Sequence, residues 1–246
     1  MRHLLSLIIS GSIGLLILSC SSEHDYVYDF TPDKNLATCI IDEMSKRGYT
    51  NPSQINTLVC QKGVIDLTGL DQLSELESLY IQDNQLTDLS TLGKMPSLKT
   101  ISVAGSNTLS SLSGIGSAPN LEEVQANKTP KLTDISDLQY LNKLKIFAAM
   151  MANIDDIRAL RNLEYLKEVV LNYNSITDLS PLERKPRLVH LQAYSNPINY
   201  LGALEDNFSL KLLGIDKDLV KLCNHVDAIR KALSKDAKIY GPENCR

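Results

Sequence analysis

Leucine recurs along most of the chain at an almost constant interval, and this interval is the clearest pattern of apolar positions in the sequence. The equivalent residues, separated by 22 or 23 positions, are Leu76, Leu98, Leu121, Leu144, Leu166, Leu188 and Leu210. A fixed period of this length is typical of a solenoid, in which each repeat is one structural unit that stacks on its neighbours. The pattern predicts a repeat region over residues 58–218.

Within each period, apolar and polar positions first alternate and then change their spacing. The clearest unit, residues 166–182, reads LKEVVLNYNSITDLSPL. The alternating step predicts a short strand with one buried face, so stacked repeats should form a parallel sheet on one side. The Asp-Leu step that follows leaves too few residues for a long helix. We therefore expect short 3₁₀ or extended turns on the convex side.

A polar residue follows the alternating step in most repeats and should turn the chain out of the strand. An asparagine amide suits this place because it can pair with backbone groups that would otherwise be buried without partners. The position is held by Asn84, Asn174 and Asn196, but by Ser106, Thr129 and Ala152 in the middle repeats. We expect local distortion of the turn in the middle of the array.

The repeat resembles that of the leucine-rich repeat family, and within it the 22-residue bacterial class typified by internalins. The resemblance covers roughly residues 58–218, and other copies of the unit hold the same frame. It implies an α/β leucine-rich repeat solenoid with a curved parallel β-sheet. Adhesion to, or recognition of, another protein is the function that this family implies.

Both ends of a solenoid would expose apolar core unless a cap covers them. Residues 33–57 predict a helical N-terminal cap, with Asp33 as N-cap and Gly48 ending the helix. Residues 219–246 predict a C-terminal cap with a helix from about 224 to 236. The apolar residues at helical spacing are Leu36, Ile40 and Met44 in the first cap and Val226, Ile229 and Leu233 in the second.

The N-terminal segment has the pattern of an export signal. Residues 1–19 combine a basic start with an apolar stretch that is too short to span a membrane comfortably. Residues 17–20, ILSC, resemble the lipobox of bacterial lipoproteins, which implies cleavage before Cys20 and a lipid on that residue; an ordinary signal peptide is the alternative. Ser21 after this cysteine favours the outer membrane, and residues 20–32 predict a flexible tether.

The cysteine count agrees with export. Of five cysteines, a lipidated Cys20 leaves two near each end of the folded region. We expect disulfides that join Cys39 to Cys60 and Cys223 to Cys245, each closing a loop of about 20 residues. Zinc is the competing use of four cysteines, but the sequence has no Cys-x-x-Cys pair.

Composition and charge narrow the function. The chain has 246 residues, 43% hydrophobic and 22% charged, with a formal net charge of -4. A nucleic-acid partner is not expected without a strong cationic surface. Known catalytic, phosphate-binding and metal-binding motifs are missing from the sequence. We expect no enzymatic activity, no cofactor and no metal, and we interpret His190 as a solvated surface residue.

If the leucines of the alternating step point inward, the residues between them point outward from the sheet. These outward residues form the candidate binding surface. They carry no lysine or arginine, and their apolar members gather on the fourth and fifth strands of the array. Exposed apolar side chains gathered on one concave patch suggest a protein interface, although a parallel sheet can also simply tolerate small outward residues. The candidate contact residues are Tyr80, Gln125, Ile146, Met150, Val170, His190, Gln192 and Tyr194, with the two tyrosines as anchors at the rim.

Two functional hypotheses remain. The first is a monomeric, non-enzymatic outer-membrane lipoprotein that binds a protein partner through the concave face of the solenoid. The second is a structural or envelope-assembly scaffold lipoprotein that faces the periplasm. A third, a carbohydrate binder or enzyme, would need an aromatic-lined polar groove, and the strands offer too few aromatic residues.

Overall fold

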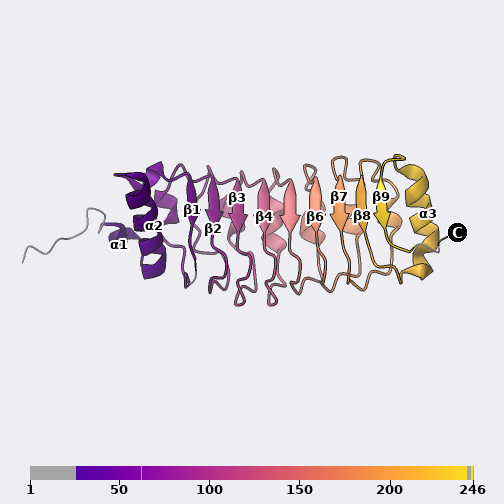
Figure 1. The fold of residues 1–246 in the computed structure, drawn as a ribbon, viewed down its shortest axis with the longest axis horizontal. Helices are drawn as coiled ribbons and strands as arrows, with labels where there is room; N and C mark the ends of the chain where they lie inside the picture. The colour runs from indigo at the N-terminus through magenta and orange to yellow at the C-terminus, as the bar shows by residue number, and fades with distance from the viewer. Residues whose placement is uncertain (1–25, 62, 243–244, 246) are drawn as a thin grey trace, which may run out of the picture.

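A computed structural model of the protein describes residues 26–61, 63–242 and 245. The expected signal peptide, residues 1–19, and the expected lipidation site, Cys20, lie outside the described residues. The described chain forms one elongated coil with a helical cap at each end (Figure 1).

Nine short parallel strands form one open curved sheet, and their order in the sheet is their order in the chain (Figure 1). Each strand has three residues. The bounds are Thr57–Val59 (β1), Ser78–Tyr80 (β2), Thr100–Ser102 (β3), Glu123–Gln125 (β4), Ile146–Ala148 (β5), Glu168–Val170 (β6), His190–Gln192 (β7), Leu212–Gly214 (β8) and Lys238–Tyr240 (β9). The predicted leucine-rich repeat solenoid is confirmed.

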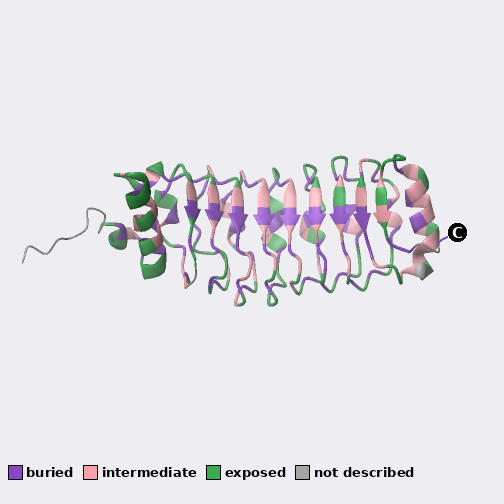
Figure 2. Ribbon diagram, in the orientation of Figure 1, coloured by how far each residue is buried: buried purple, intermediate pink, exposed green. Residues whose placement is uncertain are grey.

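The middle residue of each repeat strand points inward, and these residues pair in register along the coil. Leu79 pairs with Ile101, and Phe147 pairs with Val169. The leucines of the 22-residue period lie in the same buried core, which runs without a break from Val27 to Cys245 (Figure 2). Because every repeat contributes the same inward positions, each one covers the apolar face of the next.

The opposite side of the coil consists of short 3₁₀ helices and turns, as predicted. Their bounds are Pro52–Gln54 (η1), Leu70–Gln72 (η2), Ile115–Ser117 (η3), Ser136–Tyr140 (η4), Arg158–Leu160 (η5), Ser180–Leu182 (η6), Gly202–Leu204 (η7) and Val220–Leu222 (η8). The aspartates of the Asp-Leu and Asp-Ile steps shape these turns. Asp88 and Asp178, for example, each accept the backbone N–H of the serine two residues on, at 2.9 and 2.7 Å.

The asparagines behave as the sequence predicts where they are present. The Asn174 Oδ1 accepts the N–H of Ile154 in the preceding repeat, and its Nδ2 donates to the carbonyls of Ala149 and Leu171. In the middle repeats the shorter substitutes do not make this bridge. The Thr129 hydroxyl donates within its own turn, to the carbonyl of Ala126.

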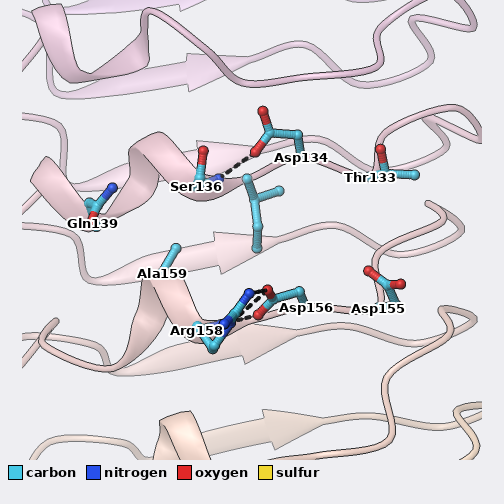
Figure 3. A pocket seen from close by; sticks show the side chains of 9 residues that line it. Thr133, Asp134, Ser136, Gln139, Asp155, Asp156, Arg158 and Ala159 are labelled. Carbon is cyan, nitrogen blue, oxygen red and sulfur yellow. Dashed lines mark hydrogen bonds and ion pairs between the residues drawn. The ribbon is translucent and has the colours of Figure 1, made fainter.

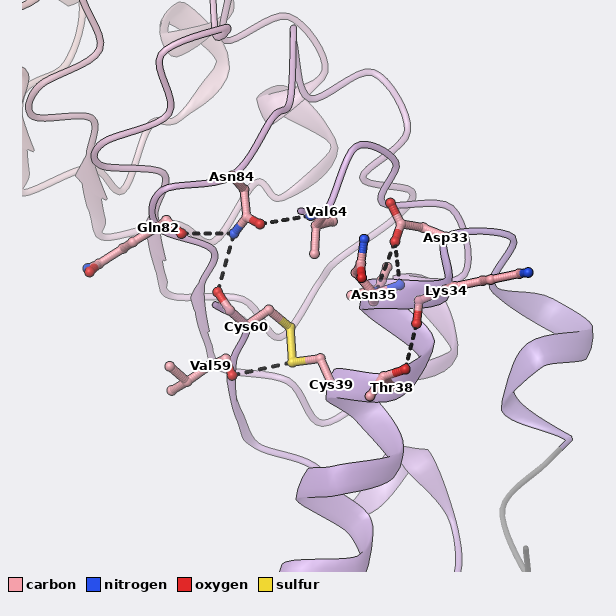
Figure 4. The surroundings of a disulfide bond; sticks show 11 residues. Asp33, Lys34, Asn35, Thr38, Cys39, Val59, Cys60, Val64, Gln82 and Asn84 are labelled. Atoms are coloured by element: carbon pink, nitrogen blue, oxygen red, sulfur yellow. Dashed lines mark hydrogen bonds between the residues drawn. A yellow bond between two sulfur atoms is a disulfide. The ribbon is translucent and has the colours of Figure 1, made fainter. Parts of the chain in front are cut away.

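The N-terminal cap contains two helices, Val27–Phe30 (α1) and Lys34–Arg47 (α2). Gly48 ends α2 in the left-handed conformation, at a φ of 70°. The predicted disulfide joins Cys39 on α2 to Cys60 after β1 (Figure 4). The tether predicted for residues 20–32 is wrong at its end, because Val27 is buried and α1 packs on α2. The single apolar turn of α1 is too short to show a helical pattern.

The C-terminal cap contains Cys223–Ala232 (α3), which ends four residues before the predicted limit. The chain then reverses, and β9 pairs with β8. The sequence analysis did not predict β9. The second predicted disulfide, Cys223 to Cys245, holds the tail against the helix. The Arg230 guanidinium donates to the carbonyl of Pro242 at 2.8 Å, which ties the same segments together.

Candidate functional site

The first and third residues of each strand point outward and form a surface that we call the sheet face. Ile146, Ala148 and Val170 are half-buried there, on β5 and β6. Ala148 pairs with Val170 across the two strands, and Ile146 pairs with Glu168. The strand phase that the sequence predicted is therefore correct.

An apolar surface continues from these strands into the loops that leave them. Met150 is half-buried after β5, whereas Met151 and Tyr173 are 44% and 53% exposed. The Met151 N–H donates to the carbonyl of Asn172, which places the two loops side by side. We call this surface the central apolar strip; its members are Ile146, Ala148, Met150, Met151, Val170 and Tyr173.

Met151 and Tyr173 were missed by the sequence analysis, and both have an unusual backbone. Their φ angles are 58° and 60°, in the left-handed region that non-glycine residues rarely adopt. The same position recurs in each repeat, as Asp83, Gly105, Lys128, Met151, Tyr173 and Ser195. Elsewhere it is held by small or polar residues, so large apolar residues in two consecutive repeats are the signal that could have identified them.

Polar side chains flank the central apolar strip on both sides. On β4, the Gln125 amide donates to the Glu123 carboxylate at 2.5 Å. On the other side, the His190 Nδ1 lies 3.8 Å from the Glu168 carboxylate. The sheet therefore brings together Gln125 and His190 with the apolar residues between them, and Gln192 lies on the same strand as His190.

The two tyrosines that were predicted as rim anchors occupy different places. Tyr80 lies on β2, separated from β4 by β3, so it is not adjacent to the central apolar strip. The Tyr194 ring lies over Gly214 of β8, where a Cβ atom would approach its Cε2 to 2.5 Å. Burial, with a smaller contribution from Tyr240, raises the Tyr194 phenol pKa above its ordinary value.

Ser102 and Asn172 are buried, although the alternation of the strands placed both on the outward surface. The Gln82 amide donates to the Ser102 hydroxyl at 3.0 Å and covers it. The Asn172 Oδ1 accepts the N–H of Tyr194 at 2.8 Å, so its side chain lies along the sheet rather than away from it. Both serve the fold more than the binding surface.

A polar hollow of about 520 Å³ lies on the opposite side of the coil, between two turns (Figure 3). Asp134 accepts the N–H of Ser136, and Asp156 accepts the N–H of Arg158 and pairs with its guanidinium. These hydrogen bonds lower the pKa of both carboxyl groups. Both carboxylates are thus engaged by their own turns.

Over residues 26–61, 63–242 and 245, no cluster of three or more His, Cys, Asp or Glu side chains is placed to hold a metal ion. None of the helices in these ranges is both long and apolar enough to cross a membrane.

Comparison with known proteins agrees with this architecture. The family of leucine-rich repeats, in a form with two copies, matches residues 74–117. A search of the curated proteins finds no match to the sequence.

Several solved structures, among them leucine-rich repeat proteins, are similar to this chain. Internalin C2 of Listeria monocytogenes is 22% identical, with a TM-score of 0.55 over 77% of this chain and 96% of that one. A leucine-rich repeat protein of Leptospira interrogans is 21% identical, with a TM-score of 0.56 over 65% and 44% of the two chains.

The ectodomain of the plant receptor kinase GASSHO1/SCHENGEN3 of Arabidopsis thaliana is 23% identical, with a TM-score of 0.54 over 65% of this chain and 20% of that one. That structure is a complex with Casparian strip integrity factor 2. At these identities the likeness shows a shared fold, and a fold by itself does not imply a function.

Proposed function

We propose that this leucine-rich repeat solenoid is a non-enzymatic, lipid-anchored protein of the outer membrane that binds a protein partner through its sheet face. The observation that carries the proposal is the central apolar strip, where half-buried and exposed apolar residues from adjacent repeats adjoin on one surface. An apolar centre with a polar margin is the usual anatomy of a protein interface.

The side chains carried on the left-handed turns of the strip support a binding role. A left-handed residue other than glycine costs on the order of 1 kcal/mol or more, and such costs concentrate at functional sites. Met151 and Tyr173 both carry this cost while exposing apolar side chains to water. The left-handed turn recurs at this position in the other repeats and so belongs to the fold, but exposed large apolar side chains there occur only in these two consecutive repeats, and we infer that the side chains serve contact with the partner.

The binding experiment compares the strip with a matched place on the same face. Purified envelopes are crosslinked to the protein and captured partners are identified. We expect the Ile146→Asp, Met150→Asp variant to lose the specific partner while its thermal unfolding changes little. Thr100→Asp, Ala104→Asp carries the same change at the equivalent positions of the repeat that contains β3 and should retain the partner. Equal capture by both variants would remove the strip as the binding site.

The lipid anchor is tested separately. The proposal predicts that the mature protein begins at Cys20 and carries acyl chains, which together make the membrane attachment effectively permanent. Mass spectrometry of the N-terminal peptide measures this modification. A Cys20→Ser variant should leave the membrane fraction; unchanged fractionation would contradict the lipoprotein assignment.

The second candidate, a scaffold that faces the periplasm, is favoured by the disulfides that close both ends of a rigid coil. Protease treatment of intact cells distinguishes the two. Cleavage of the repeats without permeabilisation indicates a protein at the cell surface. Protection until the outer membrane is opened indicates the periplasmic scaffold.

A further inference from the structure

A ladder of charged residues runs along the edge of the sheet at which the strands begin, the upper edge in Figure 1. The residue that precedes each strand takes part, and successive members are joined through backbone hydrogen bonds. From β2 to β8 the members are Glu77, Lys99, Glu122, Lys145, Lys167, Val189 and Lys211. Lys238, the first residue of β9, continues the row.

Charge pairing in this ladder changes halfway along the molecule. In the N-terminal half, Lys99 pairs with Glu77 at 2.6 Å, and Lys145 pairs with Glu122 at 2.5 Å. Beyond β5 the ladder has no acidic member. Among the described residues, Lys167 and Lys211 form no ion pair with an acidic side chain, and both are exposed.

A second row beside this ladder adds further cations and two aromatic rings. The Arg187 guanidinium lies over the Tyr165 ring, 4.3 Å from its centroid, and both residues are exposed. Phe208, on the turn that leads into β8, is 66% exposed. We call this surface the basic edge; its members are Lys143, Tyr165, Lys167, Arg187, Phe208 and Lys211.

Acidic residues near the basic edge offset only part of its charge. Asp206 and Glu183 pair with Arg184, at 3.1 and 3.6 Å. Glu164 and Glu168 flank Lys167 in the sequence and offset two of the four positive charges of the basic edge. A cationic surface with exposed rings thus remains on a protein whose overall charge is -4.

We propose that the basic edge binds an anionic membrane surface. Lysine and arginine held at such a surface each raise affinity about fivefold, and aromatic rings favour the interface between headgroups and acyl chains. Neighbouring strands are spaced about 4.8 Å apart, so the cations of successive repeats lie close together along one edge. An acidic protein segment would satisfy the cations but would give no role to Phe208.

This contact is distinct from the partner-binding surface and does not depend on a lipid at Cys20. The sheet face over β1 to β8 has no lysine or arginine on its outward strand positions, whereas the basic edge lies along one margin. Binding by this edge would set the coil side-on to the lipid. The sheet face would then stand upright, with the central apolar strip open to a partner.

Vesicle binding tests the proposal on the chain from residue 20 onward with Cys20→Ser, so that no acyl chain contributes. Flotation is measured with vesicles of phosphatidylcholine and phosphatidylglycerol in equal amounts, and with phosphatidylcholine alone. We expect binding to the anionic vesicles only, weakened by salt. The variant Lys167→Glu, Arg187→Glu, Lys211→Glu should bind on the order of a hundredfold more weakly, from about fivefold for each of the three cations removed.

A control variant changes the net charge by the same amount elsewhere. Lys94→Glu, Lys128→Glu, Lys131→Glu alters exposed lysines on other turns and should bind like the parent chain. Thermal unfolding verifies that both variants fold. Equal loss in the two variants would show that net charge alone acts and would overturn the proposal.

The variant Phe208→Ser distinguishes a membrane surface from an acidic protein as the ligand of the basic edge. We expect it to weaken binding to anionic vesicles while soluble polyglutamate, used as the acidic probe, binds no better to the parent than to this variant. If the parent chain binds polyglutamate at the basic edge but fails to float with anionic vesicles, the membrane proposal is wrong.

Discussion

Lys185 is a charged residue at a core position. Its side chain is almost fully buried, at 3% exposure, on the side of the coil opposite the sheet. The equivalent residues of the preceding repeats are the apolar Leu73, Met95, Ala118, Leu141 and Leu163. The ammonium donates to the carbonyl of Arg161, and burial lowers the pKa of this lysine below its ordinary value.

Replacing this lysine by the apolar residue of a neighbouring repeat should stabilise the protein. Lys185→Met is expected to raise the free energy of unfolding by about 1 kcal/mol at neutral pH, because a buried charge is removed. Urea unfolding measures the change. Lys94→Met, at an exposed turn, is the control and should have little effect.

Because the pKa of Lys185 is lowered in the folded protein, the stabilisation expected for Lys185→Met should depend on pH. Its folded pKa lies below that of the unfolded chain, so the unfolded state binds more protons between the two values. Stability of the parent chain should therefore rise as the pH approaches the unfolded pKa, and the advantage of Lys185→Met should shrink over that window. An advantage that stays constant with pH would mean that packing, not charge, is responsible.

The left-handed backbone at Tyr173 leads to a trade-off between stability and binding. Glycine adopts a φ of 60° without steric cost, and the exposed Tyr173 ring contributes little packing. Tyr173→Gly should raise the free energy of unfolding by about 1 kcal/mol while weakening partner capture. Tyr173→Asn, which tolerates the same conformation, should be intermediate. A destabilised glycine variant would show that ring contacts outweigh backbone strain.

At the scale of elements, Asp33 joins the cap helix to the first repeat. Its Oδ1 accepts the N–H groups of Asn35 and Leu36 and so caps α2. Its Oδ2 accepts the N–H groups of Ile65 and Asp66, which lie after β1. One carboxylate thus satisfies four backbone donors from two segments (Figure 4 shows the helix start beside the disulfide).

Loss of this carboxylate should affect both segments. Asp33→Ala is expected to lower the free energy of unfolding by about 2 kcal/mol, since the cap is lost and partly buried N–H groups are left unpaired. In Asp33→Asn one oxygen still accepts two of the backbone N–H groups, whereas the amide N–H₂ faces the other two. This variant should therefore lose roughly half as much free energy of unfolding as Asp33→Ala. Denaturant unfolding of the two variants separates the cap from the bridge; equal losses would show that the cap contributes nothing.

At the scale of the whole molecule, stability depends on the two closed ends. In a solenoid each repeat contacts only its neighbours, so the terminal repeats rely on their caps. Here each cap is fixed by one disulfide, Cys39 to Cys60 at one end and Cys223 to Cys245 at the other. The central repeats contain neither bridge.

Removing one bridge should therefore weaken one end. Cys39→Ser, Cys60→Ser is expected to lower the free energy of unfolding by about 3 kcal/mol and to speed amide hydrogen exchange in α2 and β1 first. Cys223→Ser, Cys245→Ser should do the same at α3 and β9. Uniform loss of protection across all repeats would show that the coil unfolds as one cooperative unit.

Much of the architecture could be predicted because its determinants are local and repeated. The leucine interval predicted the strands, their buried middle residues and the 3₁₀ turns, and the asparagines Asn84, Asn174 and Asn196 predicted the bridges between repeats. The helix bounded by Asp33 and Gly48 followed from capping chemistry. Cysteine positions predicted both disulfides.

Other features depend on contacts between elements, and no local sequence pattern predicts those contacts. β9 was not predicted because its three residues become a strand only where β8 offers an unpaired edge. Helix α1 is a single turn that is held by α2. Ser102 was placed outside by strand phase, yet Gln82 from the preceding repeat covers it.

The sequence alone determined the period, the inward side of each strand, the caps and the covalent closures, because each of these needs only the residue types within one repeat or one cap. The alternation also placed Ile146, Met150 and Val170 on one outward surface, but only the tertiary structure added Met151 and Tyr173 to the central apolar strip and assembled the basic edge from residues about 22 positions apart. Their contact arises from the stacking of whole coils, so chemistry that is dispersed along the chain becomes continuous only after the repeats have packed.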